Sequence, residues 1–207
     1  MDRRGFPIVI SGPSGCGKTS ICQRILTGDP LVAYSVSVTT RPPRPGEVDG
    51  DHYEFVDDGQ FDSLVESGAL AEWAVVHDYR YGTRRSVIDA LVSGGRDVIM
   101  DLDVQGAMSM REAYPESLLV FILTPSPEEL EERLRGRATD SDDVIETRLR
   151  NAVGEHEYAG KYDHRVLNDD LERAVEEVHA LIRAERERRT ERHKRSQGGV
   201  NRNRGTQ

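Results

Sequence analysis

The 207-residue chain has few of the features that mark secreted, membrane and metal-binding proteins. It contains two cysteines, Cys16 and Cys22, without the CxxC spacing of redox and zinc motifs, so we expect reduced thiols in a cytoplasmic protein. No apolar run approaches the roughly 20 residues that a membrane-spanning helix needs, and we expect no membrane partner. The N-terminus lacks the long apolar stretch and the small-residue cleavage site of a secretory signal.

The six histidines are scattered, without HExxH or any other paired metal-ligand spacing, so we expect no histidine metal site. Charge is unevenly distributed within the formal net charge of −9, because the segment from Arg183 to the C-terminus has nine Lys or Arg and three Glu. We interpret residues 191–207 as a basic, disordered tail. The acidic remainder argues against a protein built to bind nucleic acid.

Apolar runs alternate with amphipathic stretches, which is typical of an α/β protein with a parallel central sheet flanked by helices. The predicted strands of this core are residues 6–10, 35–38, 97–104, 118–124 and 164–168. The predicted helices are residues 16–26, 125–134, 142–159 and 169–189. In the second of these helices, Ser126 is the expected N-cap, Pro127 the first helical residue and Glu129 the partner in a capping box.

Residues 39–94 interrupt the alternation and predict an inserted α+β subdomain. Its first part is rich in Pro, Gly and Arg, which indicates a structured loop before a strand at 52–56. A helix at 57–70, strands at 71–76 and 79–83, and a helix at 84–95 complete the expected insertion.

The segment from Gly12 to Thr19 matches the phosphate-loop pattern GxxxxGK[ST], with a predicted strand before it and a helix after it. Its glycines allow successive backbone N–H groups to point at phosphate oxygens, and the helix N-terminus adds a positive end. Lys18 supplies a full charge, and the Thr19 hydroxyl is a candidate Mg²⁺ ligand. Cys16 lies beside these positive groups, so we expect a thiolate that is sensitive to oxidation.

The inserted subdomain carries a candidate clamp for a second phosphate. Arg41 and Arg44 flank prolines that stiffen their loop, and rigid guanidinium groups suit a phosphate dianion. Tyr53 and Tyr81 are candidate hydrogen-bond donors to the same oxygens. Spacing alone leaves open an exposed basic turn with core tyrosines.

The ordered set of motifs resembles the guanylate kinases of bacterial type. It comprises the phosphate loop, SVSVTTRPPRPGEVDGDHYEFV, EWA…YGT, MDLDVQG, GRATDS…TRL and VLNDDL, across about residues 5 to 190. The resemblance implies a P-loop kinase fold in one domain of residues 1–207, with a core of residues 5–38, 95–132 and 151–190. It also implies a nucleotide-monophosphate-binding subdomain at 39–94, a mobile lid at 133–150, and transfer of a phosphoryl group from ATP to GMP or dGMP with Mg²⁺.

The same resemblance implies the roles of individual residues. The implied ATP-binding residues are Gly12, Pro13, Ser14, Gly15, Cys16, Gly17, Lys18, Thr19, Ser20 and, near adenine, Asn168. The implied GMP-binding residues are Ser35, Arg41, Arg44, Tyr53, Glu72, Tyr81, Thr83 and Asp103. The implied catalytic residues are Lys18, Arg137, Arg148 and Asp101, with Thr19 on the metal.

The chemistry of guanine agrees with the assignment of Glu72. A carboxylate accepts hydrogen bonds from the N1–H and the exocyclic amine side by side, whereas adenine places an acceptor at N1. A hydroxyl of Ser35 or Thr83 suits guanine O6. Without the surrounding motif, Glu72 reads as a solvated strand charge beside Trp73.

Two acidic residues follow the predicted strand at 97–104, where strand ends meet ligands. Asp101 is expected to orient a Mg²⁺-bound water or to hold Lys18, and Asp103 to reach toward the acceptor. The alternative is that both acids cap the helix that begins near VQGA.

Arg137 and Arg148 lie 11 residues apart across the turn ATDSDD, so they converge only if this lid folds over the site. The alternative is exposed helix arginines in salt bridges. Two further functions remain open, a ribose bisphosphate kinase and a non-catalytic guanylate-kinase-like binding module. The sequence also leaves the oligomeric state open, a homo-oligomer included.

Overall fold

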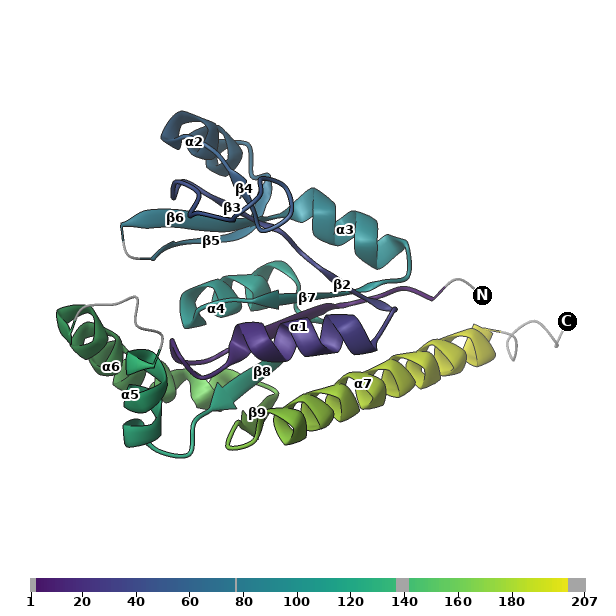
Figure 1. The fold of residues 1–207 in the computed structure, drawn as a ribbon. Helices are drawn as coiled ribbons and strands as arrows, with labels where there is room; N and C mark the ends of the chain where they lie inside the picture. The colour runs from purple at the N-terminus through teal and green to yellow at the C-terminus, as the bar shows by residue number, and fades with distance from the viewer. Residues whose placement is uncertain (1–2, 77, 137–141, 201–207) are drawn as a thin grey trace, which may run out of the picture.

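Two sheets organise the computed structural model, which describes residues 3–76, 78–136 and 142–200. The larger sheet is parallel, with the strand order β2-β7-β1-β8-β9 (Figure 1). Its strands are β1 (Pro7–Ser11), β2 (Val32–Tyr34), β7 (Asp97–Asp101), β8 (Leu118–Leu123) and β9 (His164–Leu167). The predicted α/β class with a parallel core is confirmed.

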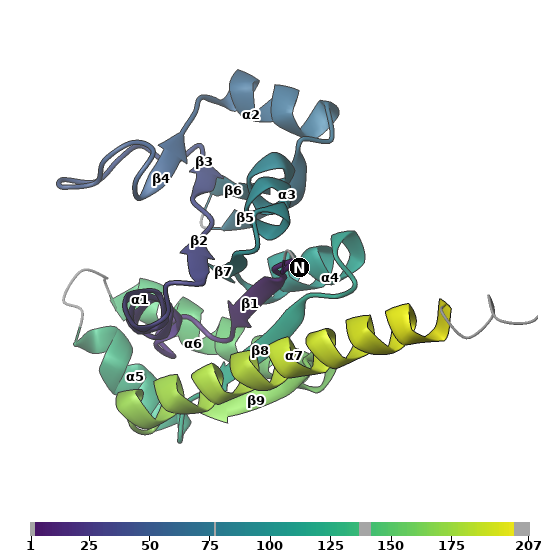
Figure 2. The same cartoon turned by 90° about the vertical axis from the view of Figure 1, so that its right-hand side faces the viewer.

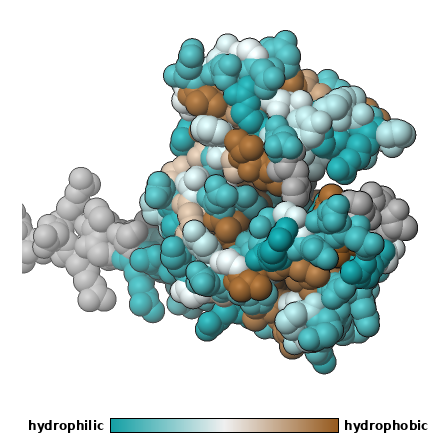
Figure 3. All heavy atoms as spheres, turned by 90° about the vertical axis from the view of Figure 1, so that its left-hand side faces the viewer, coloured by the Kyte–Doolittle hydropathy of each residue, from teal (hydrophilic) through white to brown (hydrophobic). Residues whose placement is uncertain are grey.

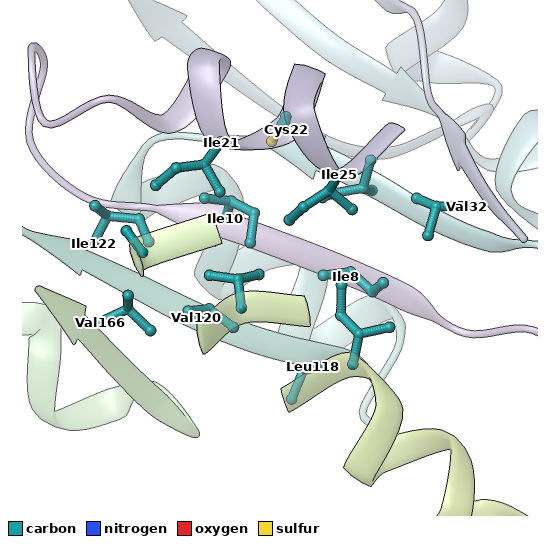
Figure 4. Close-up of a cluster of buried hydrophobic side chains, with 14 of the residues drawn as sticks. Ile8, Ile10, Ile21, Cys22, Ile25, Val32, Leu118, Val120, Ile122 and Val166 are labelled. Atoms are coloured by element: carbon teal, nitrogen blue, oxygen red, sulfur yellow. The ribbon is translucent and has the colours of Figure 1, made fainter. Parts of the chain in front are cut away.

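Helices cover both faces of this sheet because successive residues of its buried strands point to opposite sides. Ile8 and Ile10 of β1 face helices α1 (Lys18–Gly28) and α7 (Leu171–Val200), where they join one apolar cluster (Figure 4). Val9 lies in a second cluster with residues of α3 (Arg85–Ser93) and α4 (Val104–Ala113). The sheet is therefore the middle layer of a three-layer core.

The smaller sheet has the order β4-β3-β6-β5 and lies above the core in Figure 1. Its strands are β3 (Ser37–Thr39), β4 (Tyr53–Phe55), β5 (Leu70–Val76) and β6 (Tyr79–Arg84), and α2 (Asp58–Glu66) covers it. Val38, Phe61 and Leu70 form a separate small apolar cluster there. The insertion thus has a sheet and a core of its own.

Two expectations about the strands need correction. The predicted strand at 35–38 spans a junction, because β2 ends at Tyr34 in the large sheet and β3 begins at Ser37 in the small one. The predicted strand at 97–104 ends at Asp101, because Asp103 accepts a hydrogen bond from the backbone N of Gly106 and caps α4. Helix α3 packs in the second core cluster. The expected boundary at residue 94 assigns this helix to the insertion.

Helices α5 (Pro127–Arg135) and α6 (Asp142–His156) flank residues 137–141, which lie outside the described ranges. Ser126 caps α5 by accepting a hydrogen bond from the backbone N of Glu129. The expected capping box is incomplete, because the Glu129 carboxylate forms an ion pair with Arg133. A 3₁₀ turn, η1 (Glu157–Lys161), replaces the predicted last turn of α6.

Helix α7 continues to Val200, so the prediction of a disordered tail is wrong for residues 191–200. Figure 2 shows this helix extending past the sheet at its C-terminal end. Glu and Arg are strong helix formers, and the pair of Glu191 and Arg195 has the favourable i,i+4 spacing. Among the described helices, none is long and apolar enough to cross a membrane.

An ion-pair network fastens α7 to the start of β7. Asp97 is fully buried and binds the guanidinium of Arg186 on α7 at 2.7 Å and that of Arg3 at 2.5 Å. Arg186 also binds Asp29, just after α1, at 2.7 Å. The buried Asp97 carboxylate therefore binds two segments distant in sequence, and Arg186 extends the network to a third at Asp29.

Replacing Asp97 by Asn should lower the free energy of unfolding by about 3 kcal/mol, because it leaves two partly buried guanidinium groups without the full counter-charge of this buried carboxylate. Urea unfolding measures this change. Glu172→Gln, at an exposed ion pair with Arg24, is the control and should cost less than about 1 kcal/mol. Equal losses in the two variants would contradict a special role for the buried network.

Candidate active site

The phosphate loop lies between β1 and α1 and depends on left-handed backbone at its glycines. Gly15 has φ 93°, and a Cβ there would lie 2.9 Å from a side-chain carbon of Leu134. Gly17 has φ 100°, and a Cβ there would lie 2.3 Å from the side-chain nitrogen of Asn168. Only glycine fits both this conformation and these close approaches.

The side chains of Lys18 and Asn168 hold the phosphate loop by hydrogen bonds to its carbonyl oxygens. Lys18 Nζ donates to the carbonyl oxygens of Gly12 at 2.6 Å and Pro13 at 3.0 Å. Asn168, which follows β9 and is 4% exposed, donates to the carbonyl oxygen of Cys16 at 2.7 Å. The Asn168 side chain therefore supports the loop, and its contact with adenine stays a prediction.

Cys16 contradicts the expectation of an oxidation-sensitive thiolate. The residue is fully buried, and burial raises the pKa of its thiol in spite of the nearby Lys18 charge. A protonated thiol without solvent access is a poor nucleophile. The sequence argument failed because it counted the positive groups of the loop and not the burial of the sulfur.

Asp101 lies at the C-terminal end of β7 beside the phosphate loop. Its Oδ2 accepts a hydrogen bond from Thr19 Oγ1 at 2.8 Å, and its Oδ1 accepts one from the Tyr34 hydroxyl at 2.5 Å. Lys18 binds loop carbonyls, so the expectation that Asp101 holds Lys18 is not met in this structure. Sequence reasoning had given Tyr34 no role.

A cavity of about 850 Å³ opens between the edge of the large sheet, the small sheet and α6 (Figure 3). Nine of the residues singled out from the sequence line it: Gly12, Ser14, Lys18, Tyr53, Glu72, Tyr81, Asp101, Asp103 and Arg148. The phosphate loop and the acidic residue expected to read a base therefore border the same space. The other described residues singled out from the sequence as site residues are not among its lining residues: Pro13, Gly15, Cys16, Gly17, Thr19, Ser20, Ser35, Arg41, Arg44, Thr83 and Asn168.

Glu72 is 5% exposed on β5, where its Oε1 accepts a hydrogen bond from Thr83 Oγ1 at 2.5 Å. Burial raises the pKa of the Glu72 carboxyl to about 7, and the nearby Asp103 charge adds to the increase while Thr83 opposes it. The interpretation of Glu72 as a solvated strand charge is therefore wrong. Thr83 positions this carboxyl, since β6 pairs the two residues across the hairpin.

Arg41 is buried in the small subdomain and held by a residue that the sequence analysis missed. Its Nη2 binds both carboxylate oxygens of Glu47, at 2.8 and 3.0 Å, and its guanidinium lies 5.2 Å from the Tyr53 ring centroid. This hydrogen-bonded pairing with Glu47 raises the pKa of Arg41. The Arg44 side chain is exposed, and its backbone N donates to Glu47 at 2.7 Å.

Helix α6 contributes one face to the cavity. Arg148 Nη1 donates to Ser14 Oγ at 3.0 Å, which joins α6 directly to the phosphate loop. Asn151 and Glu155 also line the cavity and share this face of α6 through their helical spacing from Arg148, and Tyr158 of η1 lines the cavity beside them. That spacing was the signal that could have identified Asn151 and Glu155. Arg137, the other arginine expected in the lid, lies outside the described residues.

The buried Ser35 lies between the two sheets, where its backbone N donates to Ile99 at 3.2 Å. Within the described ranges, its hydroxyl has no hydrogen-bond partner. A role for Ser35 in reading a base stays a prediction.

Comparison with known proteins places the chain in a family. The guanylate kinase family model matches residues 4–185. The chain belongs to the guanylate kinase family. The guanylate kinase of Sphingopyxis alaskensis is 48% identical over 190 residues, which cover 91% of this chain and 86% of that protein. The guanylate kinase of Aromatoleum aromaticum is 47% identical over 191 residues, which cover 92% and 94%.

A solved member of the guanylate kinase family has the same fold. The crystal structure of guanylate kinase from Anaplasma phagocytophilum aligns with a TM-score of 0.74 at 31% identity, over 89% of this chain and 88% of that one. A gluconokinase from Sinorhizobium meliloti aligns with a TM-score of 0.50 at 17% identity, which shows a shared fold alone.

Replacing Glu72 by Gln should stabilise the protein above pH 7. Below about pH 4.5 the Glu72 carboxyl is neutral in the folded and unfolded chains, and above about pH 7 it is charged in both. Between these values only the unfolded chain is charged, so the free energy of unfolding falls as pH rises, by up to about 3 kcal/mol. Urea unfolding at pH 5 and pH 8 should show that the advantage of the variant grows with pH.

The exposed Glu176→Gln is the control for this measurement and should change stability by less than about 0.5 kcal/mol at either pH. A Glu72→Gln variant whose advantage is the same at both pH values would contradict the raised pKa.

Proposed function

We propose that the protein is an ATP:GMP phosphotransferase that makes ADP and GDP, with dGMP as a second acceptor. The observation that carries the proposal is the shared cavity, which Lys18 of the phosphate loop and the carboxyl of Glu72 both line. A cationic loop suits a triphosphate donor, and a buried carboxylate suits the donor edge of guanine. Membership of the guanylate kinase family supports the same reaction.

On the donor side, residues Gly12 to Ser20 would hold the ATP phosphates, together with Mg²⁺. In the described part of the chain, no group of three or more His, Cys, Asp or Glu residues could hold a metal. Mg²⁺ carried by a nucleotide needs only one or two protein oxygens besides water and phosphate, so the Thr19 hydroxyl next to Asp101 fits it. When bound, the ion would neutralise charge on the transferred phosphoryl group.

On the acceptor side, Glu72 in its ionised form would accept hydrogen bonds from guanine N1–H and the exocyclic amine. Tyr53 and Tyr81, which line the cavity, would donate to the GMP phosphate, with Arg41 and Arg44 as its counter-charges. Glu47 holds Arg41 in place for this task. Asp103 would contact the acceptor from the start of α4, and Ser35 would contribute a hydroxyl.

Transfer would be direct and in line, without a covalent intermediate on the protein. The acceptor phosphate is already an anion, so the task of the site is to hold two repelling anions together and to neutralise them. Lys18, Arg148 and Arg137 would spread the negative charge of the transition state. Closure of the lid at 133–150 would exclude water, which would otherwise accept the phosphoryl group.

We place this reaction in the cytoplasm, because Cys16 and Cys22 are both unpaired thiols. The proposed role is the phosphorylation and recycling of GMP among the purine nucleotides, either as a monomer or in a homo-oligomer.

A coupled assay that offers ATP with GMP, AMP, UMP or ribose 1,5-bisphosphate tests the function. We expect turnover with GMP to exceed that with each other acceptor by at least about 10³-fold, since a mismatched base leaves Glu72 unpaired. In Glu72→Gln the preference for GMP over AMP should fall by about 10²-fold or more. Turnover of ribose bisphosphate alone, or of no acceptor, would refute the proposal.

Replacing Arg148 by Ala should lower kcat by about 10²- to 10³-fold and change ATP affinity little, because the charge acts mainly on the transition state. Stopped assays at saturating ATP and GMP measure kcat, and calorimetry with a non-hydrolysable ATP analogue measures affinity. Arg183→Ala, at an exposed residue of α7, is the control with unchanged kcat. A normal kcat in Arg148→Ala would remove this residue from the mechanism.

A further inference from the structure

Tyr34 joins the edge strand of the large sheet to the candidate metal site. It is the last residue of β2 and pairs with Ile99 of β7, two residues before Asp101. Its ring packs against the apolar cluster under α1, and its hydroxyl donates to Asp101 Oδ1 at 2.5 Å. The side chain also lines the 850 Å³ cavity.

The two oxygens of Asp101 have different partners. Oδ1 accepts from Tyr34, while Oδ2 accepts from Thr19 at 2.8 Å. A carboxylate on a short side chain that is bonded at both oxygens cannot rotate about its terminal torsion without breaking one bond. Tyr34 and Thr19 together therefore fix the plane of the Asp101 carboxylate.

The direction of the Thr19 hydrogen bond has a chemical consequence. A hydroxyl has one hydrogen to donate, and that of Thr19 is directed at Asp101. Its oxygen lone pairs, which a cation requires, are then free to point elsewhere. Any loss of the Asp101 orientation would release this hydroxyl to rotate.

The orientation of Asp101 matters because the positive charge of Lys18 is an alternative partner for its carboxylate. Lys18 Nζ binds the carbonyl oxygens of Gly12 and Pro13 at the edge of the same cavity. An Asp101 carboxylate without its Tyr34 partner would turn toward this charge, because Lys18 offers a full positive charge that the Thr19 hydroxyl lacks. Such a turn would withdraw Asp101 from Thr19 and Lys18 from the phosphates.

We propose that Tyr34 is a positioning residue that acts through Asp101 to hold the Thr19 hydroxyl ready for the metal of a bound nucleotide. The inference rests on the proposed function for the identity of that ligand as Mg²⁺ with an adenine nucleotide. Tyr34 itself touches neither the metal nor the transferred group. Its effect is on the preorganisation of the donor half of the site.

The test compares Tyr34→Phe with Tyr114→Phe. Both substitutions delete a phenol that donates to an aspartate, since the Tyr114 hydroxyl binds Asp89 at 2.9 Å, away from the cavity. Calorimetry measures the dissociation constant of ADP with and without excess Mg²⁺, and the ratio of the two constants is the metal-dependent gain. We expect Tyr34→Phe to reduce this gain about tenfold, as for the loss of one hydrogen bond to a charged group, and Tyr114→Phe to leave it unchanged.

A double-substituted variant tests whether Tyr34 acts through Asp101. If it does, adding Tyr34→Phe to Asp101→Asn should reduce the gain no further than Asp101→Asn does alone. An unchanged gain in Tyr34→Phe, an additive loss in the double variant, or an equal loss in Tyr114→Phe would each overturn the proposal. The thermal midpoint of each variant checks that the fold is intact, and a merely structural phenol would shift this midpoint and leave the gain unchanged.

The outcome is separable from that of the proposed function, because ADP binding requires no acceptor. Suppose that the wild-type protein does not phosphorylate GMP, but that the metal-dependent gain in ADP affinity falls in Tyr34→Phe. This result would refute the proposed function and support the role of Tyr34. A protein active on GMP whose gain is insensitive to Tyr34→Phe would support the function and refute the role of Tyr34.

Discussion

The parallel pairing of β1 with β7 is the constraint on which the site depends. Ile10 of β1 lies opposite Asp101 of β7, so the phosphate loop and the acidic segment begin at the same edge of the sheet. The Thr19–Asp101 hydrogen bond is a direct result of this register. A shift by one residue would turn Asp101 to the other face of the sheet and remove it from the loop.

Burial changes two titratable groups near this edge in the same direction, but with different results for ligand binding. It raises the pKa of both the Cys16 thiol and the Glu72 carboxyl. The sulfur is packed in the apolar core, whereas the carboxyl borders the cavity, where a ligand can supply the hydrogen bonds that water no longer gives. The energetic cost of burying the Glu72 carboxyl thereby becomes selectivity for a ligand with matching donors.

The fold was largely predictable from sequence because apolar runs, glycines and cap residues are local signals. The phosphate loop was equally local, with its spacing and its flanking elements adjacent in the chain. Glu47 and Tyr34 were missed because their partners, Arg41 and Asp101, are chosen by side-chain directions that no motif records. The junction at Ser35 was missed for a related reason, since SVSV reads as one strand although its ends belong to two sheets.

The burial of the two cysteines makes their thiols probes of local opening in this protein. Cys16 and Cys22 are both at most 1% exposed, and both belong to the cluster between α1 and the large sheet. An alkylating reagent in solution therefore reaches the Cys22 sulfur only when α1 separates from the strands beneath it, and the Cys16 sulfur only when the phosphate loop opens. The rate of alkylation of the native chain would therefore measure how often these segments open. A nucleotide bound at the start of α1 would lower this rate.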